Sequence, residues 1–339
     1  MLPSRYIDTA TFSRRLRDKS VLLSEKKVLV ANLYNSYQET DSYTKPNCRG
    51  FGRIRVFKNY TLHLRTAVNP LLKIKPLFRG HPPVEVLRTQ VFQIAACNWR
   101  CWYCFVDDDR LSANISVAKF LSADELLDMY LAEDNPPDII ELSGGEADLV
   151  PEWTLWMMEA MTRRGLAGKV YLWTENNLST RFLWEFLSPA QIDFMLNFPM
   201  HSRVGCFKGC DVESFVFSTR SNPKQFEEQF AIFRDLLRIG FDMYAYATFI
   251  FPSYTDFASV MREFVDRLQH IHPKLPLRTI PLKINPFAAP IARHAGFNQA
   301  LFNQSLDIQY EAYRAWEAEL KERFTQEELE MPYDAVKLT

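Results

Sequence analysis

The chain has 339 residues, of which 47% are hydrophobic and 24% are charged, and its formal net charge is −1. This composition is typical of globular proteins and excludes a largely disordered chain, and the length allows one large domain or two smaller ones. No hydrophobic run is long enough for a membrane span. Asp8 and Asp18 interrupt the basic N-terminal residues, so we expect no export signal. Clustered cysteines in such a chain predict a cytoplasmic location.

The charge is unevenly distributed along the chain. Residues 1–80 contain 16 Lys and Arg against 5 Asp and Glu, whereas the remainder contains 24 against 36. One interpretation is that the basic segment packs on the acidic body of the protein. The other is a surface for an anionic partner, such as a nucleotide, RNA or an acidic electron donor. That surface would centre on Arg49, Arg53, Arg55, Phe57, Lys58, Tyr60 and Arg65, a stretch that also has the pattern of a two-stranded hairpin.

Strand-like hydrophobic segments alternate with amphipathic helical ones from about residue 90 to residue 285. This alternation predicts βα units around a parallel sheet. We expect strands at residues 91–95, 138–142, 169–174, 203–208, 241–250 and 278–284. The fourth is ambiguous, because residues 192–209 contain either one strand or a helical turn followed by strand 203–208.

Capping signals indicate the helices between these strands. Ser122 and Glu125 form a capping box, and Pro151 suits the first turn of the next helix. We expect helices at residues 122–132, 151–165, 180–187, 222–240, 257–269 and 307–324. The chain is thus predicted to contain a basic N-terminal extension (1–89), a core (90–290) and a C-terminal helical extension (291–339).

Three of the six cysteines, Cys97, Cys101 and Cys104, lie within eight residues, directly after the first predicted core strand. Thiolates this close can converge from a single loop, and sulfur ligands select iron–sulfur clusters, zinc or cuprous ions. Three protein ligands would leave one iron of a four-iron cluster open. Zinc is disfavoured because its fourth ligand would have to be a distant histidine, and a ferredoxin would bring a fourth cysteine close by.

The second predicted strand ends in Ser143-Gly144-Gly145-Glu146. Functional groups of parallel α/β proteins collect where strands end, so this turn should lie beside the cysteine loop. Glycines allow the backbone to approach a ligand closely, and Glu146 adds a carboxylate. Together these features suit a small zwitterion held against an iron.

With Tyr103 before the last cysteine and Gly144-Gly145-Glu146 after the next strand, residues 90–285 resemble the radical S-adenosylmethionine (SAM) superfamily. The resemblance implies an α/β fold with a partial (β/α)6 TIM-like barrel. It implies a [4Fe–4S] cluster on Cys97, Cys101 and Cys104, with SAM on the fourth iron and its amino group near the Gly-Gly-Glu turn. The reduced cluster would cleave SAM to methionine and a 5′-deoxyadenosyl radical that abstracts a substrate hydrogen. A flavodoxin or ferredoxin would supply the electron.

The resemblance extends less specifically to other strand ends. Asn176, with Glu175 next to it, would bind the SAM ribose, and Lys208 would meet the SAM carboxylate. A strand-end cap or a surface lysine explains these residues equally well. Tyr244, Tyr246 and Thr248 share one strand face that either meets substrate in the barrel or only fills it. Adenine contacts remain unassigned.

Cys206 and Cys210, with Cys48, would hold a second cluster or else are packed small residues. Of the six histidines, only His294, beside Arg293, is a candidate functional residue. The substrate is predicted to be an anionic nucleotide or RNA, or a protein partner. The alternative is a non-catalytic iron–sulfur, SAM-binding or electron-transfer protein.

Overall fold

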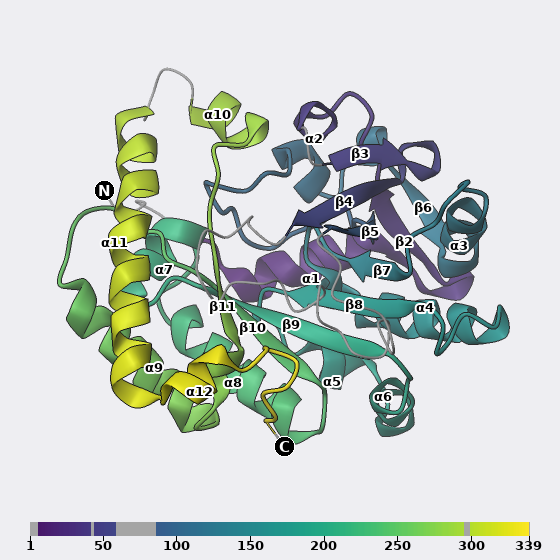
Figure 1. Cartoon of the computed structure of the whole chain (residues 1–339). Coiled ribbons are helices and arrows are strands. Elements are labelled where there is room, and N and C mark those ends of the chain that lie inside the picture. Colours follow the sequence, from purple (N-terminus) through teal and green to yellow (C-terminus); the bar gives the residue numbers. More distant parts are fainter. Residues whose placement is uncertain (1–5, 42–43, 59–85, 295–298, 339) are drawn as a thin grey trace.

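The computed structural model describes residues 6–41, 44–58, 86–294 and 299–338, so Tyr60 and Arg65 of the predicted basic surface lie outside it. Its main sheet has eight strands in the order β11-β10-β9-β8-β7-β5-β4-β3 (Figure 1). Their bounds are β3 (Thr44–Asn47), β4 (Gly52–Lys58), β5 (Val86–Phe92), β7 (Ile139–Leu142), β8 (Tyr171–Asn176), β9 (His201–Lys208), β10 (Met243–Thr248) and β11 (Thr279–Leu282). The strands from β5 to β11 pair in parallel. The fold is therefore α/β with a largely parallel sheet, consistent with a partial TIM-like barrel.

The N-terminal extension adds antiparallel strands to this sheet. Strands β3 and β4 form a hairpin, and β4 pairs with β5. Of the stretch 49–65 that was predicted as a hairpin, residues 52–58 form β4 and residues 59–65 lie outside the described residues. A second, three-stranded antiparallel sheet joins β1 (Val21–Leu22), β2 (Lys27–Ala31) and β6 (Ala118–Ser122). Helix α1 (Thr9–Ser20) begins at Asp8, whose carboxylate accepts a hydrogen bond from the Thr11 amide.

After α1 come the helices α2 (Tyr37–Thr40), α3 (Ala123–Leu131), α4 (Pro151–Arg163), α5 (Phe182–Phe186), α6 (Pro189–Leu196), α7 (Val212–Thr219), α8 (Gln225–Arg238), α9 (Phe257–Ile271), α10 (Ala288–His294), α11 (Gln299–Arg323) and α12 (Gln326–Glu330). Several of them, including α4, α8 and α9, pack against the outer face of the main sheet. The capping box of Ser122 and Glu125 is present at the start of α3. Buried residues such as Met157, Phe233 and Phe264 form one hydrophobic core with the outward-facing strand residues. This core fixes the strands whose ends carry the candidate site.

Several predicted boundaries are wrong. The first core strand was expected at residues 91–95 but is β5, which ends at Phe92. The chain turns away because Ile94 and Ala96 form isolated bridges with Val30 and Ser112 instead. Residues 192–209 contain a helix followed by a strand, so the second interpretation is correct. The expected helix at 307–324 begins earlier, at Gln299, and α7 and α10 were not expected.

Alternate strand residues form a second hydrophobic group on the inner face of the sheet. It contains Leu87, Ile139, Tyr171, Trp173, Val204, Cys206, Tyr244, Tyr246 and Ile280. Tyr244 and Tyr246 thus share one face, as their alternation predicted. A buried polar group lies on the same face, where Glu141 accepts hydrogen bonds from Arg55 (2.5 Å) and from Thr89 (2.9 Å).

Basic residues of the extension face carboxylates of the core. Arg14 pairs with Glu185, Arg17 with Glu152 and Lys26 with Glu159, while Arg55 pairs with Glu141 and Glu175. Arg53, only 1% exposed, is also directed inward. Part of the basic charge is therefore matched within the molecule.

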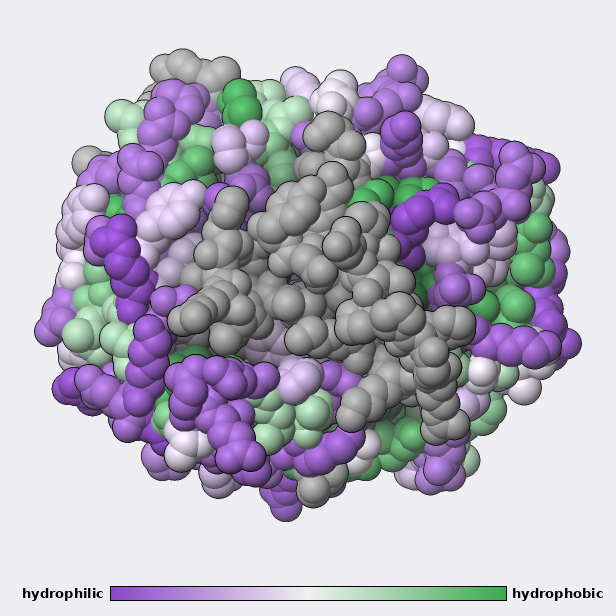
Figure 2. Space-filling view, in the orientation of Figure 1, coloured by the Kyte–Doolittle hydropathy of each residue, from purple (hydrophilic) through white to green (hydrophobic). Residues whose placement is uncertain are grey.

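On the face seen in Figure 2, the residues not drawn in grey are mostly hydrophilic, with hydrophobic ones scattered among them. Within the described parts of the chain, no helix is both long and hydrophobic enough to cross a membrane.

Candidate functional site

The cysteine loop leaves the sheet after β5 and is fixed by main-chain hydrogen bonds. The Cys97 amide donates to the Leu111 carbonyl (3.0 Å), and the Cys104 amide donates to the Cys101 carbonyl (2.9 Å). Cys97, Cys101 and Cys104 are all partly exposed and free of disulfides. The structure thus presents all three thiols on one loop at the carboxyl end of β5.

Cationic side chains bind the carbonyls of this loop from two sides. The Arg100 guanidinium donates to the carbonyls of Cys97 (2.5 Å) and Trp99 (3.0 Å). From α10, Arg293 donates to the carbonyls of Trp102 (3.1 Å), Cys104 (3.0 Å) and Val106 (2.9 Å). The His294 ring nitrogen lies 3.0 Å from the Trp102 carbonyl. These contacts hold the loop in one conformation and bring positive charge to it. Sequence reasoning proposed His294 as a candidate and named Arg293 only as its neighbour.

Aromatic packing anchors the middle of the loop. The Trp102 ring makes edge or tilted contacts with Tyr103, Phe217, His294 and Phe302. The Tyr103 hydroxyl donates to Thr248 Oγ1 (3.2 Å), at the end of β10. The residue at the predicted aromatic position therefore ties the loop to the opposite side of the sheet.

The surroundings of the three thiols raise their pKa values. Burial raises the pKa of Cys104 to about 11, and burial together with nearby Cys101 raises the pKa of Cys97. Burial also raises the pKa of Cys101, although the positive charges of Lys208, Arg293 and Arg100 oppose this shift. These cations would favour a bound group with net negative charge.

The Gly144-Gly145-Glu146 turn lies directly against the cysteine loop. The Glu146 amide donates to the Ala96 carbonyl (2.7 Å). Gly145 has a φ of +83°, and a Cβ there would lie 2.3 Å from the Ile94 carbonyl oxygen and 2.7 Å from the Ala96 carbonyl oxygen. Only glycine permits so close an approach of the two main chains. The predicted proximity of the two loops is present in the structure.

Asn177 connects the Glu146 carboxylate to the cysteine loop. Its amide donates to Glu146 Oε2 (2.7 Å), and its side-chain nitrogen lies 2.9 Å from Asn98 Oδ1 and 3.9 Å from Cys97 Sγ. Glu146 Oε1 accepts from the Asp148 amide (3.1 Å). Burial and the nearby Asp148 carboxylate raise the pKa of Glu146. Sequence reasoning missed Asn177 and Asn98. The pair Asn176-Asn177 could have indicated Asn177, because neighbouring side chains at a strand end point in different directions and either of them can face the cysteine loop.

Asn176 and Glu175 lie at the same end of β8. Asn176 is buried, its Oδ1 accepts from the Leu178 amide (3.1 Å), and its Nδ2 has no hydrogen-bond partner among the described residues. Glu175 accepts from Ser143 Oγ (2.7 Å) and Arg55 (3.3 Å). Asn176 Nδ2 is therefore available to donate a hydrogen bond to a ligand, whereas the Glu175 carboxylate already accepts hydrogen bonds from Ser143 and Arg55.

Lys208 ends β9 beside the cysteine loop. Burial favours its neutral form, but nearby Tyr103 and Cys206, followed by Cys101 and Cys104, raise the pKa of Lys208 overall. The amine thus remains a cation near the thiols.

The other three cysteines lie apart from one another. Cys206 is on the inner face of the sheet, whereas Cys210 and Cys48 belong to the outer core. Burial raises the pKa of Cys206 and that of Cys48 to about 12, the latter with a contribution from Glu133. The structure does not bring these three residues together.

Among the residues that the structure describes, no three or more His, Cys, Asp or Glu side chains are already grouped to hold a metal ion.

No protein-family model matches this sequence, and a comparison with curated proteins gives no match. Among solved structures, the chain is similar to Streptococcus suis SuiB bound to the precursor peptide SuiA, with 13% identity and a TM-score of 0.39. The similarity covers 53% of this chain and 36% of SuiB, so the chain spans about a third of that protein. SuiB bound to S-adenosylmethionine gives 15% identity over 52% of this chain and 36% of SuiB, with a TM-score of 0.36.

The chain is also similar to TYW1 with a lysine–pyruvate adduct bound, with 12% identity and a TM-score of 0.38. This similarity covers 64% of the present chain and 72% of TYW1. At these identities the similarity concerns the fold alone.

Proposed function

We propose that this protein is a radical SAM enzyme with a single [4Fe–4S] cluster on Cys97, Cys101 and Cys104. The observation that carries the proposal is the contact between the cysteine loop and the Gly144-Gly145-Glu146 turn. The Glu146 amide binds the Ala96 carbonyl, and Asn177 lies between the Glu146 carboxylate and Cys97. Three thiols and a fixed carboxylate therefore share one end of two neighbouring parallel strands.

The surroundings of the thiols fit an iron–sulfur cluster. Thiolates are the usual ligands of such clusters, and the cluster with its thiolates is anionic. Lys208, Arg293 and Arg100 supply positive charge within electrostatic range of Cys101. Since the described residues contain no preassembled metal-ligand group, the proposal rests on this environment and on the shared loop.

The surroundings also fit SAM. Asn176 Nδ2 and Asn177 Oδ1 are buried polar atoms with no partner among the described residues, and such atoms are costly unless a ligand or water binds them. Gly144 and Gly145 let the turn pack tightly against Gln93, Ile94 and Ala96, which fixes it beside the cysteine loop. A polar, zwitterionic ligand would supply partners for the two asparagine atoms.

The chemistry supplied by the bound cluster would be one electron to the SAM sulfonium, which yields methionine and a 5′-deoxyadenosyl radical. The protein's own residues would orient SAM and keep water from the reacting centre. Glu146 is held by two backbone amides, so its position is fixed before the amino group of SAM binds. Lys208 offers a cation to the SAM carboxylate, and Asn176 offers a donor to the ribose. The aromatic inner face of the sheet excludes water from the reacting centre.

The test is SAM cleavage by the anaerobically reconstituted protein with dithionite as reductant. We expect 5′-deoxyadenosine and methionine in equal amounts, slowly even without substrate. The variant Cys101→Ser should form neither product, whereas Cys210→Ser should form both. A protein that holds a cluster but cleaves no SAM would instead support a non-catalytic iron–sulfur protein.

A further inference from the structure

Two carboxylates and an arginine meet on the inner face of the sheet, beside the loops of the proposed SAM site. Arg55 Nη1 donates to Glu141 Oε1 (2.5 Å) and to Glu175 Oε1 (3.3 Å). Glu141 also accepts from the Thr89 hydroxyl (2.9 Å), and Glu175 Oε2 accepts from Ser143 Oγ (2.7 Å). Ser143 directly precedes the Gly-Gly-Glu turn. The group therefore lies next to the residues that are proposed to hold SAM.

The positive charge in this group is shared unequally between the two carboxylates. The contact of Arg55 with Glu141 is much shorter than its contact with Glu175. Although burial opposes it, the charges of Arg55 and Arg53 lower the pKa of Glu141. Burial and the neighbouring Glu141 instead raise the pKa of Glu175. Glu175 is thus the carboxylate whose negative charge is less well matched within the group.

Glu175 is also the carboxylate that a ligand can reach. Its side chain is 18% exposed, whereas the side chain of Glu141 is fully buried. Two residues earlier on β8, Trp173 is fully buried, and its ring centroid lies 5.2 Å from that of Tyr244. These rings fill the barrel toward the amino ends of the strands. A molecule therefore reaches Glu175 from the carboxyl ends of the strands, where the cysteine loop lies.

A second observation indicates that this polar layer takes up a further molecule. Trp173 is the register partner of Glu141, and its buried indole nitrogen has no hydrogen-bond partner among the described residues. Buried donors nearly always bind protein, water or a ligand. The layer is therefore incomplete without a water or an acceptor atom of a bound molecule.

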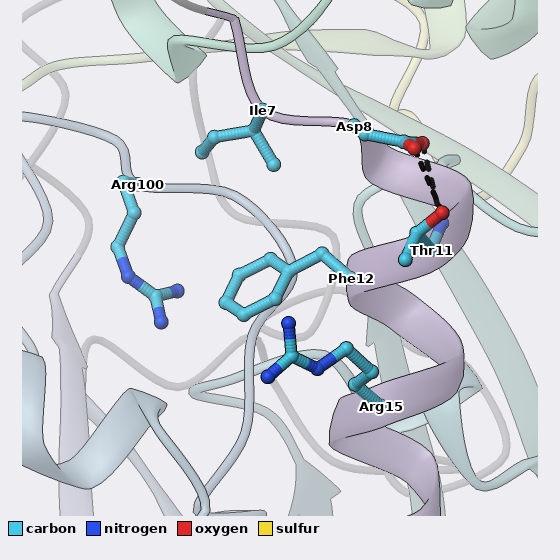
Figure 3. A pocket seen from close by; sticks show the side chains of 6 residues that line it. All are labelled: Ile7, Asp8, Thr11, Phe12, Arg15 and Arg100. Atoms are coloured by element: carbon cyan, nitrogen blue, oxygen red, sulfur yellow. Dashed lines mark hydrogen bonds between the residues drawn. The ribbon is translucent and has the colours of Figure 1, made fainter.

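The surface hollow between α1 and the cysteine loop is not a comparable site. Figure 3 shows Arg15 and Arg100 near the Phe12 ring in this hollow. Arg100 already donates to the carbonyls of Cys97 and Trp99, so it anchors its own loop. We therefore place the substrate inside the barrel.

We propose that the substrate carries a protonated amine, which binds the Glu175 carboxylate while the rest of the molecule extends toward SAM. This inference rests on the proposed function, because it names the substrate class of that site. Each oxygen of Glu175 already accepts one hydrogen bond, and the remaining lone pairs can accept from an ammonium group. The ammonium ion supplies the positive charge that Arg55 gives mainly to Glu141, and a charge-assisted hydrogen bond results.

The experiment compares three small probes with the reconstituted full-length protein, which is saturated with SAM and kept unreduced. Pentylamine, pentan-1-ol and pentanoate have the same number of carbon atoms and differ in the charge of the terminal group. Because SAM is present, its own amino group occupies Glu146. Saturation-transfer NMR titrations give the dissociation constants. We expect pentylamine to bind about tenfold more tightly than pentan-1-ol, and pentanoate to bind most weakly.

The variant Glu175→Gln locates the amine. Glutamine keeps the size and one acceptor oxygen of the side chain but removes its charge. Pentylamine affinity should fall on the order of tenfold, whereas pentan-1-ol affinity should not change. Iron content and the circular dichroism spectrum, both equal to those of the parent protein, establish that the variant is folded. Glu263→Gln, at an exposed position of α9, is the matched control and should bind pentylamine as the parent protein does.

Tighter binding of pentanoate than of pentylamine to the parent protein would overturn the inference and would indicate an anionic substrate group at Arg55. This comparison decides the matter even if Glu175→Gln does not fold. Equal pentylamine affinities in the parent protein and in folded Glu175→Gln would also overturn it, because the amine would then bind elsewhere. Absence of SAM cleavage with dithionite would contradict the proposed function alone, since probe binding is measured without a reductant.

Discussion

Cys97, Cys101 and Cys104 have surroundings unlike those of Cys48, Cys206 and Cys210. The first three share a loop whose carbonyls are bound by Arg100 and Arg293, and cations lie near the thiols. The others lie in the hydrophobic cores and do not share a loop, and of these three only Cys206 has cations, Lys208 and Arg55, among the described charged groups nearest to it. All six are free thiols, so residue type does not separate the two sets. The comparison teaches that a shared loop with anchored carbonyls, rather than residue type or a nearby cation, sets the first three cysteines apart.

The largest expected effect is on iron content, which should depend on the three loop cysteines and not on the other three. Reconstituted parent protein should contain about four irons per chain, and Cys97→Ser or Cys101→Ser should reduce this to less than about one. Cys210→Ser should keep the parent value, as should Cys48→Ala. Iron and sulfide analysis after gel filtration measures the cluster content of the parent protein and of each variant. About eight irons per chain, or loss of iron in Cys210→Ser, would mean that the second set also binds a cluster.

The next effect concerns the carboxylate that joins the two loops. Glu146→Gln removes the charge that would bind the SAM amino group, and its NH₂ cannot accept from the backbone amides of Asp148 and Asn177 as the carboxylate does. A hydrogen bond to a charged group contributes about 1.5–3 kcal/mol, so SAM affinity should fall roughly 10- to 100-fold. Equilibrium dialysis with labelled SAM measures this at unchanged iron content. Glu322→Gln, on the exposed side of α11, is the control, and equal affinities in the two variants would remove Glu146 from the SAM site.

A smaller effect is expected from the residue that binds the loop from α10. Arg293→Gln removes donors to the carbonyls of Trp102, Cys104 and Val106. Because the glutamine amide can replace some of these donors, the net cost is about 1 kcal/mol, and the cluster should be lost to a chelator several times faster. The loss of iron absorbance after addition of the chelator gives this rate. Arg314→Gln on α11 should leave the rate unchanged. A parent-like rate in Arg293→Gln would show that the carbonyl contacts do not hold the loop.

The smallest effect tests the packing role of the second set. Cys206→Ala should lower the free energy of unfolding by only about 1 kcal/mol, because it removes one small side chain from the inner hydrophobic group. Urea denaturation of the cluster-free protein measures the change, with Cys101→Ala as the comparison. A much larger loss in Cys206→Ala, accompanied by loss of SAM cleavage, would give this thiol a role beyond packing.

Sequence patterns predicted the parallel sheet and the loops that meet at its end. Strand alternation placed Tyr244 and Tyr246 on one face, and Gly144-Gly145-Glu146 was correctly expected beside the cysteines. These features depend on local spacing and on the shared direction of parallel strands, both of which are visible in a single sequence.

Contacts between distant segments could not be predicted in this way. Arg293 lies almost 190 residues from the carbonyls that it binds, and no local pattern marks it. Strand β5 ends early because residues 94–96 pair with Val30 and Ser112, again a long-range choice. Asn177 rather than Asn176 contacts Cys97 because of the exact turn at the end of β8. Tertiary packing decided each of these points.

The most direct test of the central claim is the electron paramagnetic resonance spectrum of the reduced cluster before and after SAM is added. If Cys97, Cys101 and Cys104 leave one iron open beside Glu146, SAM should change the spectrum, and ¹⁷O in the SAM carboxylate should broaden it. Cys210→Ser should give the same change. A reduced cluster whose spectrum is unaffected by saturating SAM would contradict the account.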